Sequence, residues 1–178
     1  MKVEDLAIPG IKKIILSPSV DFRGKFTKIF HEGIYKEAGI HFALKEQYVS
    51  VSNKDVIRGM HFQIPPHDCD KLVTVLSGSV RDVVLDLRRN SPAYLKYINL
   101  ELKSDNCTAL LIPKGCAHGF LALEDNSTML YNVSEIYSSE SDKGVLWNSF
   151  GYEWGVKNPV ISNRDQEFCA LQQFQNPF

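Results

Sequence analysis

The sequence predicts an all-β protein, an antiparallel sandwich or barrel in a single domain spanning residues 1–178. Short apolar–polar alternations broken by turns recur at close spacing over roughly residues 11–148, a pattern typical of strands. The same stretch lacks the long helices that parallel βαβ units require. A length of 178 residues suits one domain with a substantial core.

Three stretches predict pairs of neighbouring strands. The segment 71–88 has an alternating apolar run, a Ser77-Gly78 turn and a second apolar run, which predicts a β-hairpin. Residues 97–106 and 108–115 form a second pair of strand candidates. Residues 118–137 predict a third hairpin, with its turn in the polar stretch between two apolar runs,.

Helix signals are weak and lie outside the main run of strands. Residues 31–40 predict a short helix that ends at Gly39,. Residues 162–174 predict a C-terminal helix or turn, with Ser162 as its N-cap,.

The composition excludes several function classes. The net charge is −1, from 20 Lys+Arg against 21 Asp+Glu, so nothing indicates nucleic acid or an anionic membrane as a partner. No apolar run approaches the length of a membrane span, and the N-terminus lacks a signal-peptide pattern. The four cysteines are widely spaced without a CxxC pair, which argues against a zinc knuckle or a disulfide framework. We expect a cytoplasmic protein.

Two short motifs carry histidines. In RGMHFQ (58–63), His61 and Gln63 share one face of a predicted strand and Phe62 points the other way,. PKGCAHGF (113–120) has a P-x-G-x-x-H pattern that resembles cupin-type barrels and directs His118 inward. Metal-binding cupins supply more ligands, and Gln63 is a poor one. Because two histidines seldom hold zinc or iron, we expect no metal. Each histidine alone is as consistent with a core position as with a functional one.

Other candidate residues have ordinary explanations when taken singly. Tyr131 on an apolar strand face is usually a core tyrosine. Lys71, Arg58 and Arg23 are ordinary charges at strand ends or turns, and Asp165 is an ordinary carboxylate near a helix start,. Their order along the chain is what gives them weight.

Taken together, these residues show a resemblance to the dTDP-4-dehydrorhamnose 3,5-epimerase family of sugar-nucleotide epimerases. The resemblance implies a double-stranded β-helix, the cupin-like jelly-roll barrel, over nearly the whole chain. The matching blocks, in the same order as in the family, are DFRGKFTKIF, VIRGMHFQ, DKLVTVLSGSVRDVVLDLRRNSPAYLKY, IPKGCAHGFLAL, LYNVSEIY, GVLWN and ISNRD.

The resemblance implies a role for each catalytic candidate. His61 is the base and Asp165 its hydrogen-bonded partner, Tyr131 is the acid on the opposite face of the sugar, and Lys71 lies beside the carbonyl. It implies no metal or redox cofactor. It also implies a homodimer, in which N-terminal strands cross to the neighbouring subunit and bring Arg23 and Phe26 to the partner's site. The expected substrate-binding residues are Arg23, Phe26, Lys28, Glu46, Gln47, Tyr48, Arg58, Gln63, His118, Tyr137, Asp142 and Arg164.

The chemistry explains why these residue types are needed. A hydrogen next to a ketone is weakly acidic, so its removal requires a positioned base and stabilisation of the enolate oxygen. Neutral His61 has suitable basicity, and a carboxylate on its far nitrogen fixes the tautomer. Inversion requires a proton from the other face, which Tyr131 would donate.

The chain departs from the family at positions that bind substrate. Lys28 replaces the usual Glu, and Glu46-Gln47-Tyr48 replaces Q-x-N. We therefore expect a different nucleotide-linked 4-keto-6-deoxy sugar, with CDP as the first alternative to dTDP, or inversion of one carbon only. The other departures are Ile136 where the family has the first of two tyrosines, Phe62 for Tyr and Leu95 for Gly.

Three alternatives remain on sequence grounds. A sugar-nucleotide 3,4-ketoisomerase would use similar acid–base groups, but would not need a donor such as Tyr131 opposite His61. A non-catalytic sugar-binding cupin would not need the pairing of a base with a carboxylate. A metal-dependent dioxygenase would need ligands that the sequence lacks.

Overall fold

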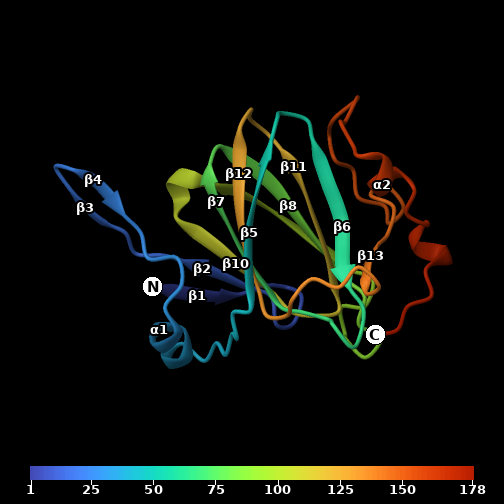
Figure 1. The fold of residues 1–178 in the computed structure, drawn as a ribbon, viewed down its shortest axis with the longest axis horizontal. Helices are drawn as coiled ribbons and strands as arrows, with labels where there is room; N and C mark the ends of the chain where they lie inside the picture. The colour runs from blue at the N-terminus through green and yellow to red at the C-terminus, as the bar shows by residue number, and fades with distance from the viewer.

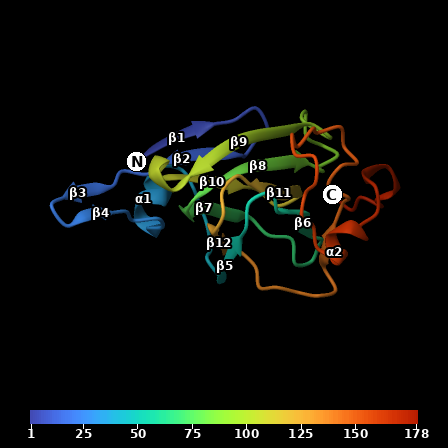
Figure 2. The same cartoon turned by 90° about the horizontal axis from the view of Figure 1, so that it is seen from above.

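Two antiparallel sheets face one another in the computed structural model, which describes all residues 1–178 (Figures 1 and 2). One sheet has the strand order β1-β2-β10-β7-β12-β5 and the other β13-β6-β11-β8-β9. The predicted all-β jelly roll is confirmed. The strands of the first sheet are β1 (Lys2–Asp5), β2 (Lys12–Ile15), β5 (Glu46–Ser52), β7 (Lys71–Ser77), β10 (Thr108–Ile112) and β12 (Ser127–Val133). Those of the second are β6 (Ile57–Gln63), β8 (Ser79–Asp86), β9 (Tyr97–Lys103), β11 (Cys116–Ala122) and β13 (Asp142–Gly144).

The three predicted strand pairs are wrong as pairs, although their strands exist. β7 and β8 follow one another through Gly78, yet β7 pairs with β10 and β12, whereas β8 pairs with β11 and β9. β9 and β10 also lie in different sheets, as do β11 and β12. Gly78 has a φ of +71°, so the turn chemistry marks a real chain reversal. A turn does not determine whether the returning strand stays in its own sheet or crosses to the other.

A two-stranded arm and two short helices complete the fold. The arm, β3 (Ser19–Asp21) with β4 (Gly24–Phe26), projects away from both sheets (Figure 1). Helix α1 (Glu32–Glu37) lies inside the predicted range, with His31 as its N-cap. The predicted C-terminal helix is much shorter than expected: α2 (Asn163–Gln166) is one turn that starts at Ser162, and a 3₁₀ turn (Leu171–Gln173) follows. A further 3₁₀ turn spans Ser104–Asn106. No helix is long and apolar enough to cross a membrane.

Packing leaves one end of the space between the sheets available for a site. The main core cluster fills the rest of that space with apolar side chains such as Val73, Val84 and Leu110. The C-terminal segment covers the outer face of the second sheet, where Trp154 and Phe174 pack on a cluster that includes Phe62. Because the outer face of β6 is covered in this way, its alternate side chains point into the space between the sheets.

Candidate active site

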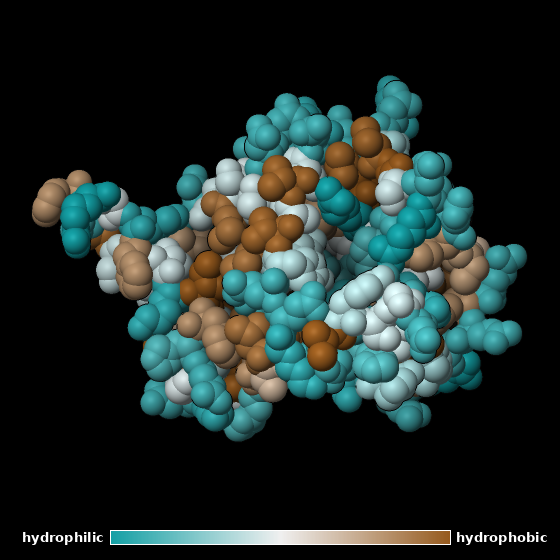
Figure 3. All heavy atoms as spheres, viewed as in Figure 1, coloured by the Kyte–Doolittle hydropathy of each residue, from teal (hydrophilic) through white to brown (hydrophobic).

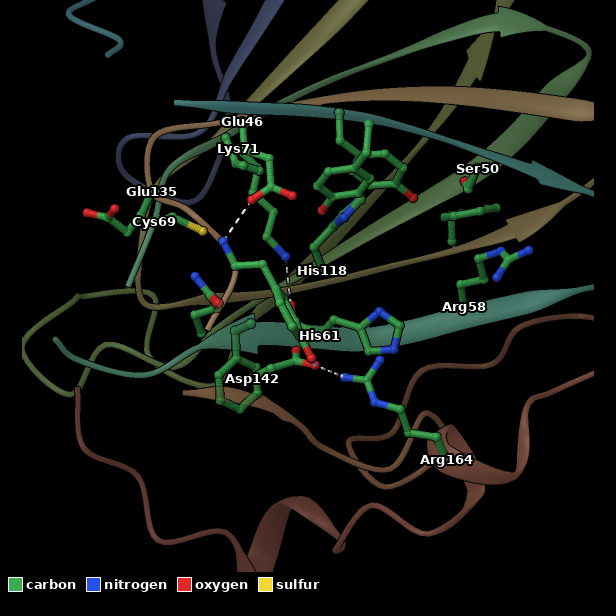
Figure 4. Close-up of a pocket in the computed structure, with 17 residues that line it drawn as sticks. Glu46, Ser50, Arg58, His61, Cys69, Lys71, His118, Glu135, Asp142 and Arg164 are labelled. Atoms are coloured by element: carbon green, nitrogen blue, oxygen red, sulfur yellow. Dashed lines mark hydrogen bonds and ion pairs between the residues drawn. The ribbon is translucent and has the colours of Figure 1, made fainter. Parts of the chain in front are cut away.

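A cavity of about 360 Å³ opens between the two sheets. His61 and His118 come from the second sheet, whereas Lys71 and Tyr131 come from the first. Figure 4 shows Lys71, His61 and His118 around the same space, with Arg164 reaching toward Asp142 at its edge. The predicted residues that line the cavity are His61, Lys71, Tyr131, Glu46, Tyr48, Arg58, Gln63, His118, Tyr137, Asp142 and Arg164.

His61 and Asp165 form a hydrogen-bonded pair. Nε2 of His61 lies 2.8 Å from Oδ1 of Asp165, and the Gly59 N–H donates to Oδ2 at 3.0 Å. An ionised carboxylate only accepts hydrogen bonds, so Nε2 carries the proton and Nδ1 of the neutral ring is free to accept one. Burial lowers the pKa of His61, although Asp165 opposes this. Burial would raise the pKa of Asp165, but its bonds to His61 and Gly59 hold it below the ordinary value.

The backbone near this pair requires glycine. Gly59 has a φ of +131°, and a Cβ there would lie 2.5 Å from the Cα of Gly119 on β11. Both the conformation and the close approach exclude larger residues. Gly59 therefore lets β6 approach β11 and aims its own N–H at Asp165, which sits in α2 behind His61.

Lys71 contributes a buried cation to the cavity. Its Nζ donates to the His61 carbonyl at 3.1 Å, and no carboxylate lies within ion-pair distance of it. Burial lowers the pKa of Lys71, since desolvation disfavours the charged form. The ammonium keeps hydrogen-bonding capacity for a group inside the cavity.

Tyr131 lies in the other sheet from His61. It is 7% exposed, and burial raises the pKa of its phenol well above the ordinary value, so the hydroxyl stays protonated at neutral pH. Its ring stacks on Tyr48, with centroids 4.7 Å apart and planes 17° apart. The His118 ring meets Tyr131 edge-on at 6.1 Å.

A second imidazole–carboxylate pair lies next to the first. His118 and His61 are opposite one another in the pairing of β11 with β6. Nε2 of His118 lies 2.8 Å from Oδ2 of Asp82. Both partners are buried, and Oδ1 of Asp82 has no hydrogen-bond partner.

The Gln63 amide forms hydrogen bonds with backbone groups. Its Nε2 donates to the carbonyls of His67, at 2.8 Å, and Ile136, at 3.3 Å, while its Oε1 accepts from the Ser138 N–H at 2.7 Å. The bonds to Ile136 and Ser138 hold the loop that carries Tyr137, and the bond to His67 holds the segment after β6. The sequence analysis expected Gln63 to bind substrate and did not identify these backbone partners.

Charged pairs border the mouth of the cavity. Asp142 accepts from Arg164 at 2.6 Å and from the Tyr137 hydroxyl at 3.4 Å. Arg58 donates to the Ser52 hydroxyl and the Val51 carbonyl and has no ion-pair partner among the salt bridges of the structure. Its guanidinium is therefore available to an anion.

Four predicted substrate-binding residues lie away from this cavity. Gln47 points to the other face of β5 and donates to Asn132 at 2.6 Å, because side chains alternate along a strand. Arg23 and Phe26 belong to the projecting arm, and Lys28 follows it. Lys28 therefore does not gather with Glu46 and Tyr48 within one subunit.

The sequence analysis missed six lining residues. Ser50 follows Glu46 and Tyr48 at the two-residue spacing of β5, so strand alternation was a usable signal for it. The others have no local signal that separates them from core or loop residues. The missed residues are Ser50, Phe62, Cys69, Phe120, Val133 and Glu135. No group of three or more His, Cys, Asp or Glu has the geometry to hold a metal ion.

Comparison with known proteins identifies the family. The family model described as dTDP-4-dehydrorhamnose 3,5-epimerase matches residues 5–173. This chain belongs to that family. The dTDP-4-dehydrorhamnose 3,5-epimerase of Shigella flexneri is 36% identical over 182 aligned positions, which cover 98% of this chain and 99% of the relative.

Solved structures of sugar epimerases share the fold over nearly the whole chain. The Bacillus anthracis enzyme, with TDP and PPi bound, superposes with a TM-score of 0.93 at 35% identity, covering 96% of this chain and 99% of that one. ChmJ from Streptomyces bikiniensis, a 3'-monoepimerase in complex with dTDP-quinovose, gives 0.88 at 26% identity and covers 94% and 86%. The predicted family and the predicted isomerase class are confirmed.

Proposed function

We propose that this protein epimerises a 4-keto-6-deoxyhexose linked to dTDP or CDP, at C3, C5 or both, in deoxysugar biosynthesis. The observation that carries the proposal is the placement of His61 and Tyr131 in opposite sheets across one cavity. A base and a protonated phenol on opposite sides of a sugar ring are what inversion at carbon requires. A ketoisomerase or a simple binding protein does not require a proton donor on the side of the sugar opposite the base.

The reaction follows from the hydrogen bonds of the site. Nδ1 of His61 removes the proton next to the C4 ketone, and the electron pair moves onto the carbonyl oxygen, which the Lys71 ammonium stabilises. Asp165 holds the tautomer and stabilises the imidazolium. The Tyr131 hydroxyl then gives its proton to the opposite face of the same carbon, and the ketone re-forms with inverted configuration.

Nucleotide binding is assigned to the mouth of the cavity. We assign the diphosphate to Arg58, because it is the guanidinium at this cavity without a carboxylate partner. Tyr137 is 63% exposed and offers a ring on which a base can stack. Glu46 stands where the resemblance implies an amide and bonds to the Tyr137 N–H, which supports a nucleotide preference different from that of its relatives.

A second copy of the chain is the proposed partner. The arm exposes Phe22 (98%), Val20 (73%) and Phe26 (68%), and a lone two-stranded hairpin is marginal in water. Apolar side chains also gather over β5, the edge strand of its sheet, where Val49 and Val51 are exposed (Figure 3). We propose that the arm packs on a partner subunit and brings Arg23, Phe26 and Lys28 toward its cavity.

Mixed dimers test this sharing of sites. We expect Arg23→Ala and His61→Ala dimers each to be nearly inactive. Refolding the two variants together would create dimers with one intact site if Arg23 serves the partner, and activity would return. No recovery in verified mixed dimers would contradict the arrangement.

A cytoplasmic location accompanies the proposal and is consistent with the four free cysteines,.

Isotope exchange tests the function directly. The protein is incubated with dTDP-4-keto-6-deoxyglucose, and separately with its CDP counterpart, in deuterated water while NMR follows the C3 and C5 hydrogens. We expect exchange with inversion that disappears in His61→Ala. Exchange at one carbon would identify an epimerase that inverts a single centre. Full-rate exchange at both C3 and C5 of the dTDP-linked sugar would mean that the substitutions in the pocket do not change the substrate. No exchange with either nucleotide would contradict the proposed function.

A further inference from the structure

The face of β5 that lines the cavity contacts two tyrosines of the site. Glu46 and Tyr48 alternate along this face. Glu46 contacts the backbone N–H of Tyr137, and Tyr48 contacts the ring of Tyr131. Neither residue therefore acts only as a surface that meets the nucleotide sugar.

Tyr48 holds the ring of Tyr131. The two residues are directly opposite in the pairing of β5 with β12, and their rings stack at 4.7 Å and 17°. A stacked neighbour on a paired strand restricts rotation of the Tyr131 side chain, because any swing of the ring must break the stack or push Tyr48 aside. The hydroxyl of Tyr131 is thereby kept in one direction.

Glu46 holds the backbone of Tyr137. Its Oε2 accepts the Tyr137 N–H at 2.7 Å, and the Tyr137 hydroxyl lies 3.4 Å from Asp142. Glu46 thus anchors a residue in the loop after β12, at the mouth of the cavity. An acceptor from β5 ties that loop to the first sheet, while Gln63 ties it to the second.

We propose that Tyr48 and Glu46 are positioning residues: Tyr48 aligns the acid Tyr131 for proton return, and Glu46 anchors Tyr137 for nucleotide binding. The inference rests on the proposed epimerase function and assigns the two substitutions on β5 to separate steps. Tyr48 then affects the chemical step, whereas Glu46 affects binding.

A misaligned Tyr131 has a specific chemical consequence. His61 still removes the proton, and the enolate still forms beside Lys71. If Tyr131 cannot reach the opposite face, the imidazolium returns a proton or a solvent deuteron to the face it came from. The ketone re-forms with its original configuration, so the carbon exchanges its hydrogen without inversion.

The ratio of exchange to inversion in deuterated water tests the role of Tyr48. In Tyr48→Ala we expect this ratio to rise about tenfold or more and kcat for inversion to fall, because small displacements of a reacting group are costly. KM stays within about twofold. Tyr48→Phe, which keeps the stack, recovers most of the loss. The matched control is Tyr97→Ala, which removes a tyrosine of similar exposure (39% against 42%) that packs on Phe150 and Tyr152 away from the cavity.

The outcomes separate this inference from the function on which it rests. A wild-type enzyme that inverts its substrate, with an unchanged ratio in a folded Tyr48→Ala, would overturn the role of Tyr48 and leave the epimerase intact. Failure of Tyr48→Phe to recover inversion would overturn the stacking argument. Wild-type protein without exchange on either nucleotide would overturn the function itself.

Glu46 is tested by separating KM from kcat. We expect Glu46→Ala to raise KM about tenfold with little change in kcat or in the exchange ratio, because only the loop that binds nucleotide loses its anchor. Glu46→Gln keeps an oxygen that can accept from Tyr137 N–H and recovers most of the affinity. An effect of Glu46→Ala on kcat alone would contradict this division.

Discussion

Two imidazole–carboxylate pairs lie side by side in this protein, and they differ in what surrounds them. His61 with Asp165 and His118 with Asp82 have the same 2.8 Å separation, and both use Nε2 of the ring. The two histidines are opposite one another on paired strands. Their hydrogen-bond chemistry alone does not distinguish a catalytic pair from a structural one.

The two pairs differ in the solvent exposure of the histidine and in the other hydrogen bonds of the carboxylate. The side chain of His61 is 27% exposed, whereas that of His118 is 3% exposed. Asp165 also accepts the Gly59 N–H, while the second oxygen of Asp82 has no partner. A proton carrier needs access to substrate and solvent, and His61 lines the cavity with a partly exposed side chain. The comparison predicts that the first pair controls rate and the second controls stability.

Removing His61 should give the largest loss of activity. General-base catalysis contributes about 10²–10⁴-fold, so we expect His61→Ala to lower the rate of hydrogen exchange at the substrate by about that factor. Exchange followed by NMR measures it. His41→Ala, an exposed histidine in the loop before β5, is the matched control. Retention of more than a tenth of the wild-type rate would remove His61 from the role of base.

Removing His118 should give the largest loss of stability. The variant His118→Ala leaves Asp82 buried without its partner, and breaking such a pair costs about 3–5 kcal/mol. In a domain of this size that lowers Tm by about 10 °C. His61→Ala should cost less, because Asp165 keeps the Gly59 N–H. Thermal denaturation of both variants measures the difference, and equal shifts would show that burial does not separate the two pairs.

The pH dependence of the first pair should respond to Asp165. Burial lowers the pKa of His61 and Asp165 partly opposes this, so the neutral base persists below its ordinary titration range. We expect kcat/KM to fall only as the pH drops through this lowered pKa. In Asp165→Asn the opposing carboxylate is lost, so the acidic limb moves to lower pH while the plateau falls about a hundredfold. A limb that moves to higher pH would contradict this electrostatic assignment.

The resemblance to the family was sufficient to select side chains that the structure brings together. His61, Lys71 and Tyr131 line one cavity and Asp165 bonds to His61. They were recognisable because they occur in motifs that resemble those of the family and in the same order. The all-β class was also predictable, since alternation and turns are local signals. Each of these inferences depends on residues close together in the chain or on a whole-chain pattern.

The features that the sequence did not predict depend on contacts between residues far apart in the chain. The strand alternation around Gly78 predicted a hairpin, although β7 and β8 belong to different sheets. Asp82 was not singled out, because nothing near it in sequence marks it as the partner of His118, 36 residues away. Pairing across such separations is decided by packing of the whole domain rather than by the turn or the strand itself.

Gln63 lies on the same face of β6 as His61, but it makes no hydrogen bond to a catalytic side chain. Its amide satisfies three backbone groups near Tyr137. Gln63→Glu keeps the acceptor for Ser138 N–H but removes both donors, and brings a charge close to two carbonyls. Because we propose that the affected loop binds nucleotide, we expect KM to rise about tenfold and kcat to change by less than about threefold. Steady-state kinetics with the preferred nucleotide sugar, beside His61→Ala, measures the split. A fall in kcat with KM unchanged would mean that Gln63 acts on the proton transfer, and that the row of side chains on β6 works as one unit with its base.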